Sequence, residues 1–264
     1  MVEVKQAGRG RSADPDTDPA AGGATLQALA VGENLVASNA GWTFAGEVSK
    51  VFDSHVSRSV PLYHEGHRLI AQVSDFFVKS DSVVYEIGSS TGSLTRMLAE
   101  RHAGKTGARF IGLDVEPDMV AQAKRKCADL RSVELLQANA VEFEFQKADL
   151  IVAYYTVQFI APKYRQQLFD KLYQALNWGG ALMLFEKVRA PDARFQDIAT
   201  QVYHEYKLDR GYTSDDVVGK MRSLKGVLEP FSTAGNLGLM ERAGFVDVTS
   251  VMKYVCFEGF LAIK

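Results

Sequence analysis

The chain has 264 residues, of which 47% are hydrophobic and 23% charged, and its formal net charge is −2. These values fit a globular protein with a substantial core, and they exclude a general basic field for direct contact with nucleic acid. The sequence lacks an apolar run of membrane-spanning length and the apolar core of a signal peptide, and its two cysteines, Cys127 and Cys256, are expected to be free thiols. We therefore expect a cytoplasmic protein without a membrane partner or a direct nucleic-acid partner.

The first 80 residues divide into a leader and a cap. Residues 1–24 are rich in Gly, Ala, Asp and Pro and cannot bury enough apolar surface to fold, so we expect a disordered leader. Residues 25–80 are expected to form an N-terminal helical cap. This cap begins with a weak helix within 25–39, continues with apolar side chains between Trp42 and Phe52, and ends with an amphipathic helix at about 64–78.

From residue 81 to residue 264, strand and helix patterns alternate as in a doubly wound α/β domain. Apolar strand patterns occur at about 83–87, 108–114, 133–137, 149–153 and 181–185. Helix patterns lie between them, and the long helix at about 162–177 is expected to end at Trp178-Gly179-Gly180. A polar, mostly helical insertion follows at about 191–235, and two closing strands are expected at about 246–252 and 254–263.

The first of these strands leads into the turn Glu86-Ile87-Gly88-Ser89-Ser90-Thr91-Gly92, where glycines let a ligand approach the backbone closely. A dinucleotide-binding turn needs glycine at the position of Ser90, because the pyrophosphate lies against bare backbone. Glu86 repels a diphosphate but can hold a positively charged amino-acid group. Asp114, at the end of the second strand, can accept hydrogen bonds from both hydroxyls of a ribose. The pattern therefore favours S-adenosylmethionine over NAD.

These motifs resemble those of class I S-adenosylmethionine-dependent methyltransferases. Further segments between Gly41 and Lys264 resemble the carboxy-S-adenosylmethionine synthase branch: Gly41-Trp42-Thr43-Phe44, Arg58-Ser59-Val60-Pro61, Thr156-Val157-Gln158-Phe159, Asp170–Asn177, Gly179–Leu182 and Ala243-Gly244-Phe245. The resemblance implies a Rossmann-like, mostly parallel, seven-stranded sheet with an antiparallel last strand, and a homodimer. It also implies, for a synthase, that prephenate serves to carboxylate the cofactor's methyl group, in the course of transfer-RNA wobble uridine modification.

The resemblance also implies a set of cofactor-binding residues: Tyr63, Gly88, Ser89, Ser90, Asp114, Val115, Asn139 and Ala140. The glycine turn adds Glu86 and Gly92, and the end of the fourth strand adds Tyr154. Asn139 stands where the family usually has an acid near the adenine, and Tyr154 stands where the synthase has an asparagine. The family's arginine for the extra carboxylate corresponds to Met221, with Arg222 one step later. Either Arg222 takes this role through a shift in register, or the carboxylate clamp is gone.

The favoured function is that of an S-adenosylmethionine-dependent methyltransferase acting on a small-molecule acceptor, with S-adenosylhomocysteine as the bound product. The alternatives are a carboxy-S-adenosylmethionine synthase that uses prephenate and a non-catalytic cofactor-binding module. The candidates for catalysis are His204, Tyr154 and Tyr155 as a general base, and Arg222 as a holder of carboxylates. No metal site is expected, because no acid or cysteine cluster accompanies His64 and His67. Fold and cofactor do not identify the acceptor.

Overall fold

The computed structural model describes residues 28–264, so the expected leader at 1–24 lies outside the described residues. The described chain begins with a small antiparallel hairpin formed by β1 (Leu29–Ala30) and β2 (Val36–Ala37). The prediction of a weak helix in this segment is therefore wrong. Gly32, Glu33 and Asn34 have φ angles of 90°, 55° and 60°, and a right-handed helix cannot pass through residues with positive φ.

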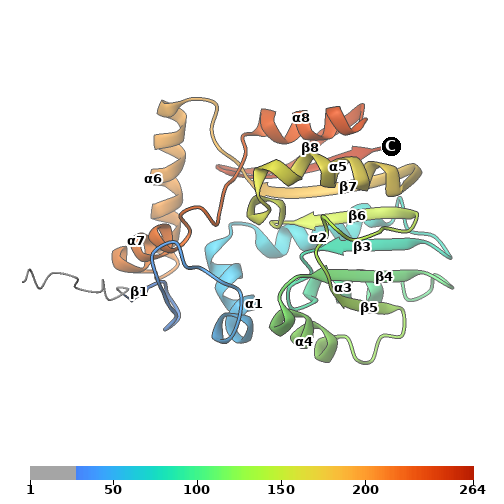
Figure 1. Cartoon of the computed structure of the whole chain (residues 1–264), viewed down its shortest axis with the longest axis horizontal. Helices are drawn as coiled ribbons and strands as arrows, with labels where there is room; N and C mark the ends of the chain where they lie inside the picture. The colour runs from blue at the N-terminus through green and yellow to red at the C-terminus, as the bar shows by residue number, and fades with distance from the viewer. Residues whose placement is uncertain (1–27) are drawn as a thin grey trace, which may run out of the picture.

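A seven-stranded sheet forms the centre of the molecule (Figure 1). Its strands lie in the order β5-β4-β3-β6-β7-β9-β8, and β9 runs antiparallel to both of its neighbours. The other neighbouring pairs are parallel, so the predicted fold class is confirmed. The strands are β3 (Val83–Ile87), β4 (Arg109–Asp114), β5 (Val133–Gln137), β6 (Ala148–Tyr154), β7 (Leu176–Lys187), β8 (Asp247–Tyr254) and β9 (Phe257–Ile263).

Helices cover both faces of the sheet, and each face has its own apolar core. Ile70 and Leu98 lie in the core on one face, and Leu172 and Met240 lie in the core on the other. Strands that are buried on both faces explain the continuous apolar runs of the sequence. The helices are α1 (Glu47–Ser59), α2 (Tyr63–Ser74), α3 (Ser93–Arg101), α4 (Pro117–Lys126), α5 (Pro162–Ala175), α6 (Ala193–Asp209), α7 (Ser214–Ser223) and α8 (Thr233–Ala243).

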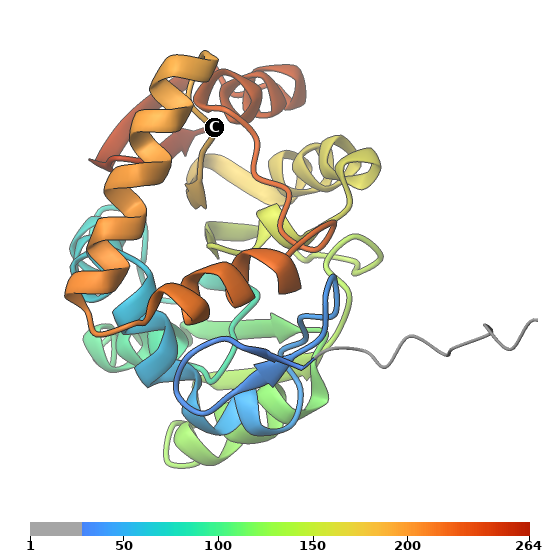
Figure 2. The same ribbon diagram turned by 90° about the vertical axis from the view of Figure 1, so that its left-hand side faces the viewer.

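The helical insertion after β7 consists mainly of α6 and α7. Together with α1 and the N-terminal hairpin, these helices lie across one end of the sheet, at the side that faces the viewer in Figure 2. Helix α1 was expected only as a run of apolar side chains, and the structure shows it as a helix of 13 residues. Among residues 28–264, no helix combines the length and the apolar character that a membrane crossing requires.

The connection between α5 and β7 differs from the prediction. Helix α5 ends at Ala175 and β7 begins directly at Leu176, so Trp178-Gly179-Gly180 lies within the strand and does not end the helix. Leu176 pairs with Ala148 in β6, and the Gly179 amide donates a hydrogen bond of 2.8 Å to the Lys264 carbonyl. Backbone partners on neighbouring segments therefore outweigh the local helix-stop pattern of the two glycines.

Candidate active site

A cavity of about 1070 Å³ lies at the carboxyl ends of the parallel strands. The ends of β3, β4, β5, β6 and β7 and the loops after them line it, together with residues of α1, α2 and the α6–α7 insertion. Open α/β sheets bind their ligands in the crevice outside the carboxyl ends of their strands. We therefore take this cavity as the candidate active site.

The glycine turn after β3 forms one wall of the cavity. Gly88 has a φ angle of 72°, and a Cβ atom at this position would lie only 2.2 Å from Oγ1 of Thr156. The same Thr156 hydroxyl donates a hydrogen bond of 2.9 Å to the Ile87 carbonyl, so it is fixed in place. Ser89 lines the cavity, and its buried hydroxyl has no hydrogen-bond partner among the described residues. The turn thus offers close backbone approach and an unsatisfied polar group to a ligand.

Two acidic residues lie beside this turn. Glu86 is buried, accepts a hydrogen bond from the Thr95 hydroxyl, and has its pKa raised to about 8 by burial. The Asp114 carboxylate accepts hydrogen bonds of 2.9 Å from the backbone amides of Ser90 and Glu116, and burial raises its pKa as well. A cationic group would favour the charged form of each acid. An α-ammonium group and ribose hydroxyls would therefore fit this donor and acceptor set.

Nearly all of the predicted cofactor residues lie along this cavity. The lining includes the two acids and the following residues of the predicted set: Tyr63, Gly88, Ser89, Ser90, Val115, Asn139, Ala140 and Tyr154. Gly92, at the start of α3, is outside the lining. A Cβ atom at this position would lie 3.0 Å from the Cβ atom of Ala123 on α4. The structure therefore gives Gly92 a role in helix packing in place of the predicted ligand contact.

Two tyrosines stand at the end of β6. The Tyr154 hydroxyl donates a hydrogen bond of 2.6 Å to the Tyr63 carbonyl. Tyr155 has a φ angle of 56°, and its buried hydroxyl has no hydrogen-bond partner within residues 28–264. Burial raises the pKa of both hydroxyls above the usual range for tyrosine. Both groups are therefore protonated near neutral pH, which disfavours the predicted role as a general base. The strained backbone of Tyr155 and its free hydroxyl are features that cluster at functional sites.

Three lysines that are near enough to interact by charge also line the cavity: Lys187 at the end of β7, Lys207 on α6 and Lys220 on α7. The Nζ atoms of Lys187 and Lys207 lie 4.4 and 4.6 Å from the centroid of the Tyr203 ring, and that of Lys220 lies over Trp42. Within the part of the chain that the structure describes, no carboxylate is within ion-pair distance of these ammonium groups. A group of lysines without such partners is a candidate site for an anionic ligand.

The surroundings of the three lysines disfavour their charged forms. Burial lowers the pKa of Lys207 to about 7 and that of Lys220 to about 5, and it also lowers the pKa of Lys187. The charge of a neighbouring cation lowers the pKa of each lysine further. An unpaired buried ammonium group is costly, and such groups are found where a ligand supplies the missing charge. Sequence reasoning missed all three residues. Only Lys187, which is the last residue of the buried strand β7, carries a signal that could have indicated it.

Comparison of this sequence with those of known proteins shows the family to which the chain belongs. A family profile described as "Methyltransferase domain" matches residues 84–180. A carboxy-S-adenosyl-L-methionine synthase from Staphylococcus epidermidis is 36% identical over 224 residues, which cover 84% of this chain and 97% of that protein. The chain belongs to the carboxy-S-adenosyl-L-methionine synthase family. A synthase from Campylobacter lari is 35% identical, over 84% of this chain and 94% of that protein.

Solved structures place this synthase-family chain within the S-adenosylmethionine-dependent methyltransferase fold. An O-methyltransferase family protein from Burkholderia thailandensis superposes with a TM-score of 0.59, at 15% identity, over 82% of this chain and 59% of that chain. Human N-acetylserotonin methyltransferase, solved with S-adenosylmethionine, gives a TM-score of 0.50 at 15% identity, over 84% and 60%. At this identity the likeness concerns the fold alone.

The structure also places the other two candidates for catalysis, His204 as a general base and Arg222 as a holder of carboxylates. His204 lines the cavity, and burial together with the charges of Lys207 and Lys187 lowers its pKa, so its imidazole is neutral near pH 7. Arg222 is exposed and outside the lining, whereas Met221 and Lys220 line the cavity. The insertion has therefore not shifted in register to bring Arg222 inward. Within residues 28–264, no cluster of His, Cys, Asp and Glu is arranged to hold a metal ion.

Proposed function

We propose that this protein is a carboxy-S-adenosyl-L-methionine synthase that binds S-adenosylmethionine and prephenate in the cavity. The observation that carries the proposal is the cavity's division into two sides. Glu86 and Asp114 form one side, at the ends of the adjacent strands β3 and β4. The other side has the buried Lys207 and the half-buried Lys187 and Lys220, at the end of β7 and on the α6–α7 insertion, and none of them has an acidic ion-pair partner among the described residues. A cationic nucleoside fits the first side, and a dicarboxylate fits the second. The identity to synthases over nearly their whole length supports the same activity.

The protein's own contribution is to bind and orient the two substrates. Bound S-adenosylmethionine would supply a methyl group whose protons are acidified by the sulfonium, so that loss of one proton lets the methyl carbon form a bond to carbon dioxide. Asp114 holds the ribose and Glu86 the amino group, while Lys187 and Lys207 hold the carboxylates of prephenate beside Tyr203. When prephenate loses carbon dioxide and hydroxide, its ring becomes aromatic, and the hydroxide can take up the methyl proton as water. The α6–α7 insertion lines the cavity in which this step takes place and restricts the access of bulk water to it.

A methyltransferase that acts on a carboxylic acid is the second candidate. Met221 favours it, because this residue stands where the resemblance implies an arginine for the cofactor's extra carboxylate, and Arg222 lies outside the cavity. A single ammonium group such as that of Lys220 does not reproduce the bidentate geometry of a guanidinium group. His204, as a neutral imidazole in the cavity, could then accept a proton from the acceptor. The homodimer implied by the resemblance stays a prediction.

Product analysis separates these candidates. The purified protein is incubated with S-adenosylmethionine, with and without prephenate, and the products are identified by liquid chromatography and mass spectrometry. We expect a cofactor heavier by one carboxyl group, formed only when prephenate is present. S-adenosylhomocysteine together with a methylated acid would instead support the methyltransferase. If neither product forms while the cofactor is retained, the chain is a binding module and both enzyme proposals are wrong.

The lowered lysine pKa values predict proton uptake when the acid binds. In the empty cavity Lys207 loses its proton near pH 7, while a bound carboxylate returns its pKa toward the usual value of 10.5. At pH 8 the binding of prephenate should therefore take up protons, and its affinity should fall as the pH rises further. Calorimetric titrations in HEPES and in Tris measure the uptake, because the two buffers release protons with different enthalpies. Equal binding enthalpies in both buffers would contradict the prediction.

A further inference from the structure

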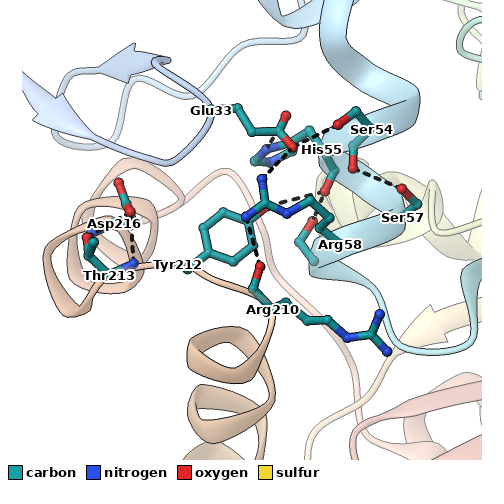
Figure 3. A network of polar contacts seen from close by, with 10 residues as sticks. Glu33, Ser54, His55, Ser57, Arg58, Arg210, Tyr212, Thr213 and Asp216 are labelled. Atoms are coloured by element: carbon teal, nitrogen blue, oxygen red, sulfur yellow. Dashed lines mark hydrogen bonds and ion pairs between the residues drawn. The ribbon is translucent and has the colours of Figure 1, made fainter.

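Arg58, in the last turn of α1, joins three separate segments of the chain outside the cavity (Figure 3). Its Nη1 lies 3.3 Å from Oε1 of Glu33, in the turn between β1 and β2. Its Nη2 donates a hydrogen bond of 2.8 Å to the carbonyl of Arg210, where α6 ends. The guanidinium carbon also lies 4.8 Å from the centroid of the Tyr212 ring, just before α7. Arg58 therefore fastens the corner between α6 and α7 to α1.

This corner leads directly to two of the cavity lysines. Lys207 is in the last turn of α6, and Lys220 is on α7, on the other side of Arg210 and Tyr212. The Lys207 carbonyl accepts hydrogen bonds from the amides of both Arg210 and Tyr212. A movement of the corner would therefore move the segments that carry both ammonium groups.

A second route connects the same cluster to Lys220. The buried Glu33 carboxylate accepts a hydrogen bond of 3.0 Å from the Ser54 hydroxyl, and its other oxygen lies 3.6 Å from Nδ1 of His55. Burial and the charges of Lys220, Lys207 and Arg58 lower the pKa of His55 to about 3, so its ring is neutral. This ring stacks on Trp42 at a centroid distance of 5.7 Å, and Lys220 covers the Trp42 ring.

We propose that Arg58 is a positioning residue that holds Lys207 and Lys220 at the cavity for the second substrate. The importance of these lysines for prephenate rests on the proposed function. A planar guanidinium group suits this place, because it pairs with Glu33, donates to a carbonyl and stacks on an aromatic ring at once. Arg58 itself does not line the cavity, so it acts through the corner and does not touch a ligand.

Tryptophan fluorescence tests the proposal without any substrate. The chain has two tryptophans, and Trp42 is buried whereas Trp178 is exposed, so the variant Trp178→Phe leaves Trp42 as the only reporter. In that background, Arg58→Met should shift the Trp42 emission to the red and speed its quenching by acrylamide, and Arg58→Lys should give a smaller change. Arg68→Met, which removes an exposed arginine of α2, is the matched control and should leave the emission unchanged. An unchanged emission in Arg58→Met would overturn the proposal.

Kinetics supply the readout that a general loss of structure would not give. Arg58→Met should raise the KM for prephenate roughly tenfold, because small displacements of binding groups are costly, and leave the KM for S-adenosylmethionine unchanged. Equal increases in both KM values, or none, would overturn the proposal. Glu33→Gln, which keeps the shape of the side chain, should act in the same direction and serves if Arg58→Met does not fold. If the wild type does not consume prephenate, the proposed function fails, and the fluorescence result still decides the role of Arg58.

Discussion

Replacing Asp114 with alanine is expected to weaken the binding of S-adenosylmethionine by about 1–3 kcal/mol, because charged hydrogen bonds to the ribose are lost. This corresponds to an increase in Kd of roughly 5- to 150-fold. The carboxylate also accepts hydrogen bonds from the amides of Ser90 and Glu116, so its removal loosens the glycine turn as well. Calorimetric titration with S-adenosylmethionine measures the change.

Two further variants show whether the effect belongs to the site. Asp114→Asn keeps the shape of the side chain and should have an intermediate affinity. Glu134→Ala removes an exposed acid from the neighbouring strand β5, and its Kd should equal that of the wild type. If Asp114→Ala binds as tightly as the wild type, the ribose does not lie at the end of β4.

The second large effect is expected for Lys207→Met. Truncating one partner of a buried charge pair costs about 2–5 kcal/mol, so kcat/KM for prephenate should fall by at least about 30-fold. The Kd for S-adenosylmethionine should not change, since Lys207 is on α6 and not among the residues of the glycine turn and the end of β4. Steady-state kinetics with each substrate varied in turn measure both quantities.

The stability of Lys207→Met should move in the opposite direction. In the empty protein this buried ammonium group has no acidic partner among the described residues, and its pKa is lowered to about 7, so it opposes folding. Methionine fills a similar volume without this cost, and the Tm should rise. The exposed Lys124→Met, on α4, should change neither Tm nor kcat/KM. A lower Tm combined with weaker binding of both substrates would show a structural role for Lys207 only.

The fold was accessible from sequence where burial leaves a long signal. Strands such as Ala148–Tyr154 are covered on both faces and therefore appear as continuous apolar runs, which fix the α/β alternation. The N-terminal hairpin was not accessible, because strands of two residues carry no periodicity. The end of α5 was misjudged because the pairing of Leu176 with Ala148 is a long-range contact that local patterns do not contain.

The acidic residues of the candidate site could be predicted from the sequence, whereas the lysines of α6 and α7 could not. Glu86 and Asp114 lie at the carboxyl ends of the parallel strands β3 and β4, which meet at one edge of the sheet, so sequence order alone brings them together. Lys207 and Lys220 lie on amphipathic helices, where a lysine that faces a cavity looks the same as one that faces water. Arg222 was selected on sequence proximity, whereas in the structure Lys220 and Met221 line the cavity and Arg222 does not. Only the packing of the α6–α7 insertion across the end of the sheet determines which of these adjacent residues of α7 lines the cavity.

The contact between Tyr154 and Gly66 limits how this cavity can be redesigned. A Cβ atom at residue 66 would lie 2.2 Å from the Tyr154 hydroxyl, so the large ring is tolerated because α2 has a glycine beneath it. Replacing Tyr154 with asparagine, as in the synthase branch, would leave empty space above Gly66. A larger residue at position 66 would clash with the Tyr154 ring while that tyrosine is still present. The two positions should therefore be exchanged together, and libraries that vary them one at a time would miss the viable combinations.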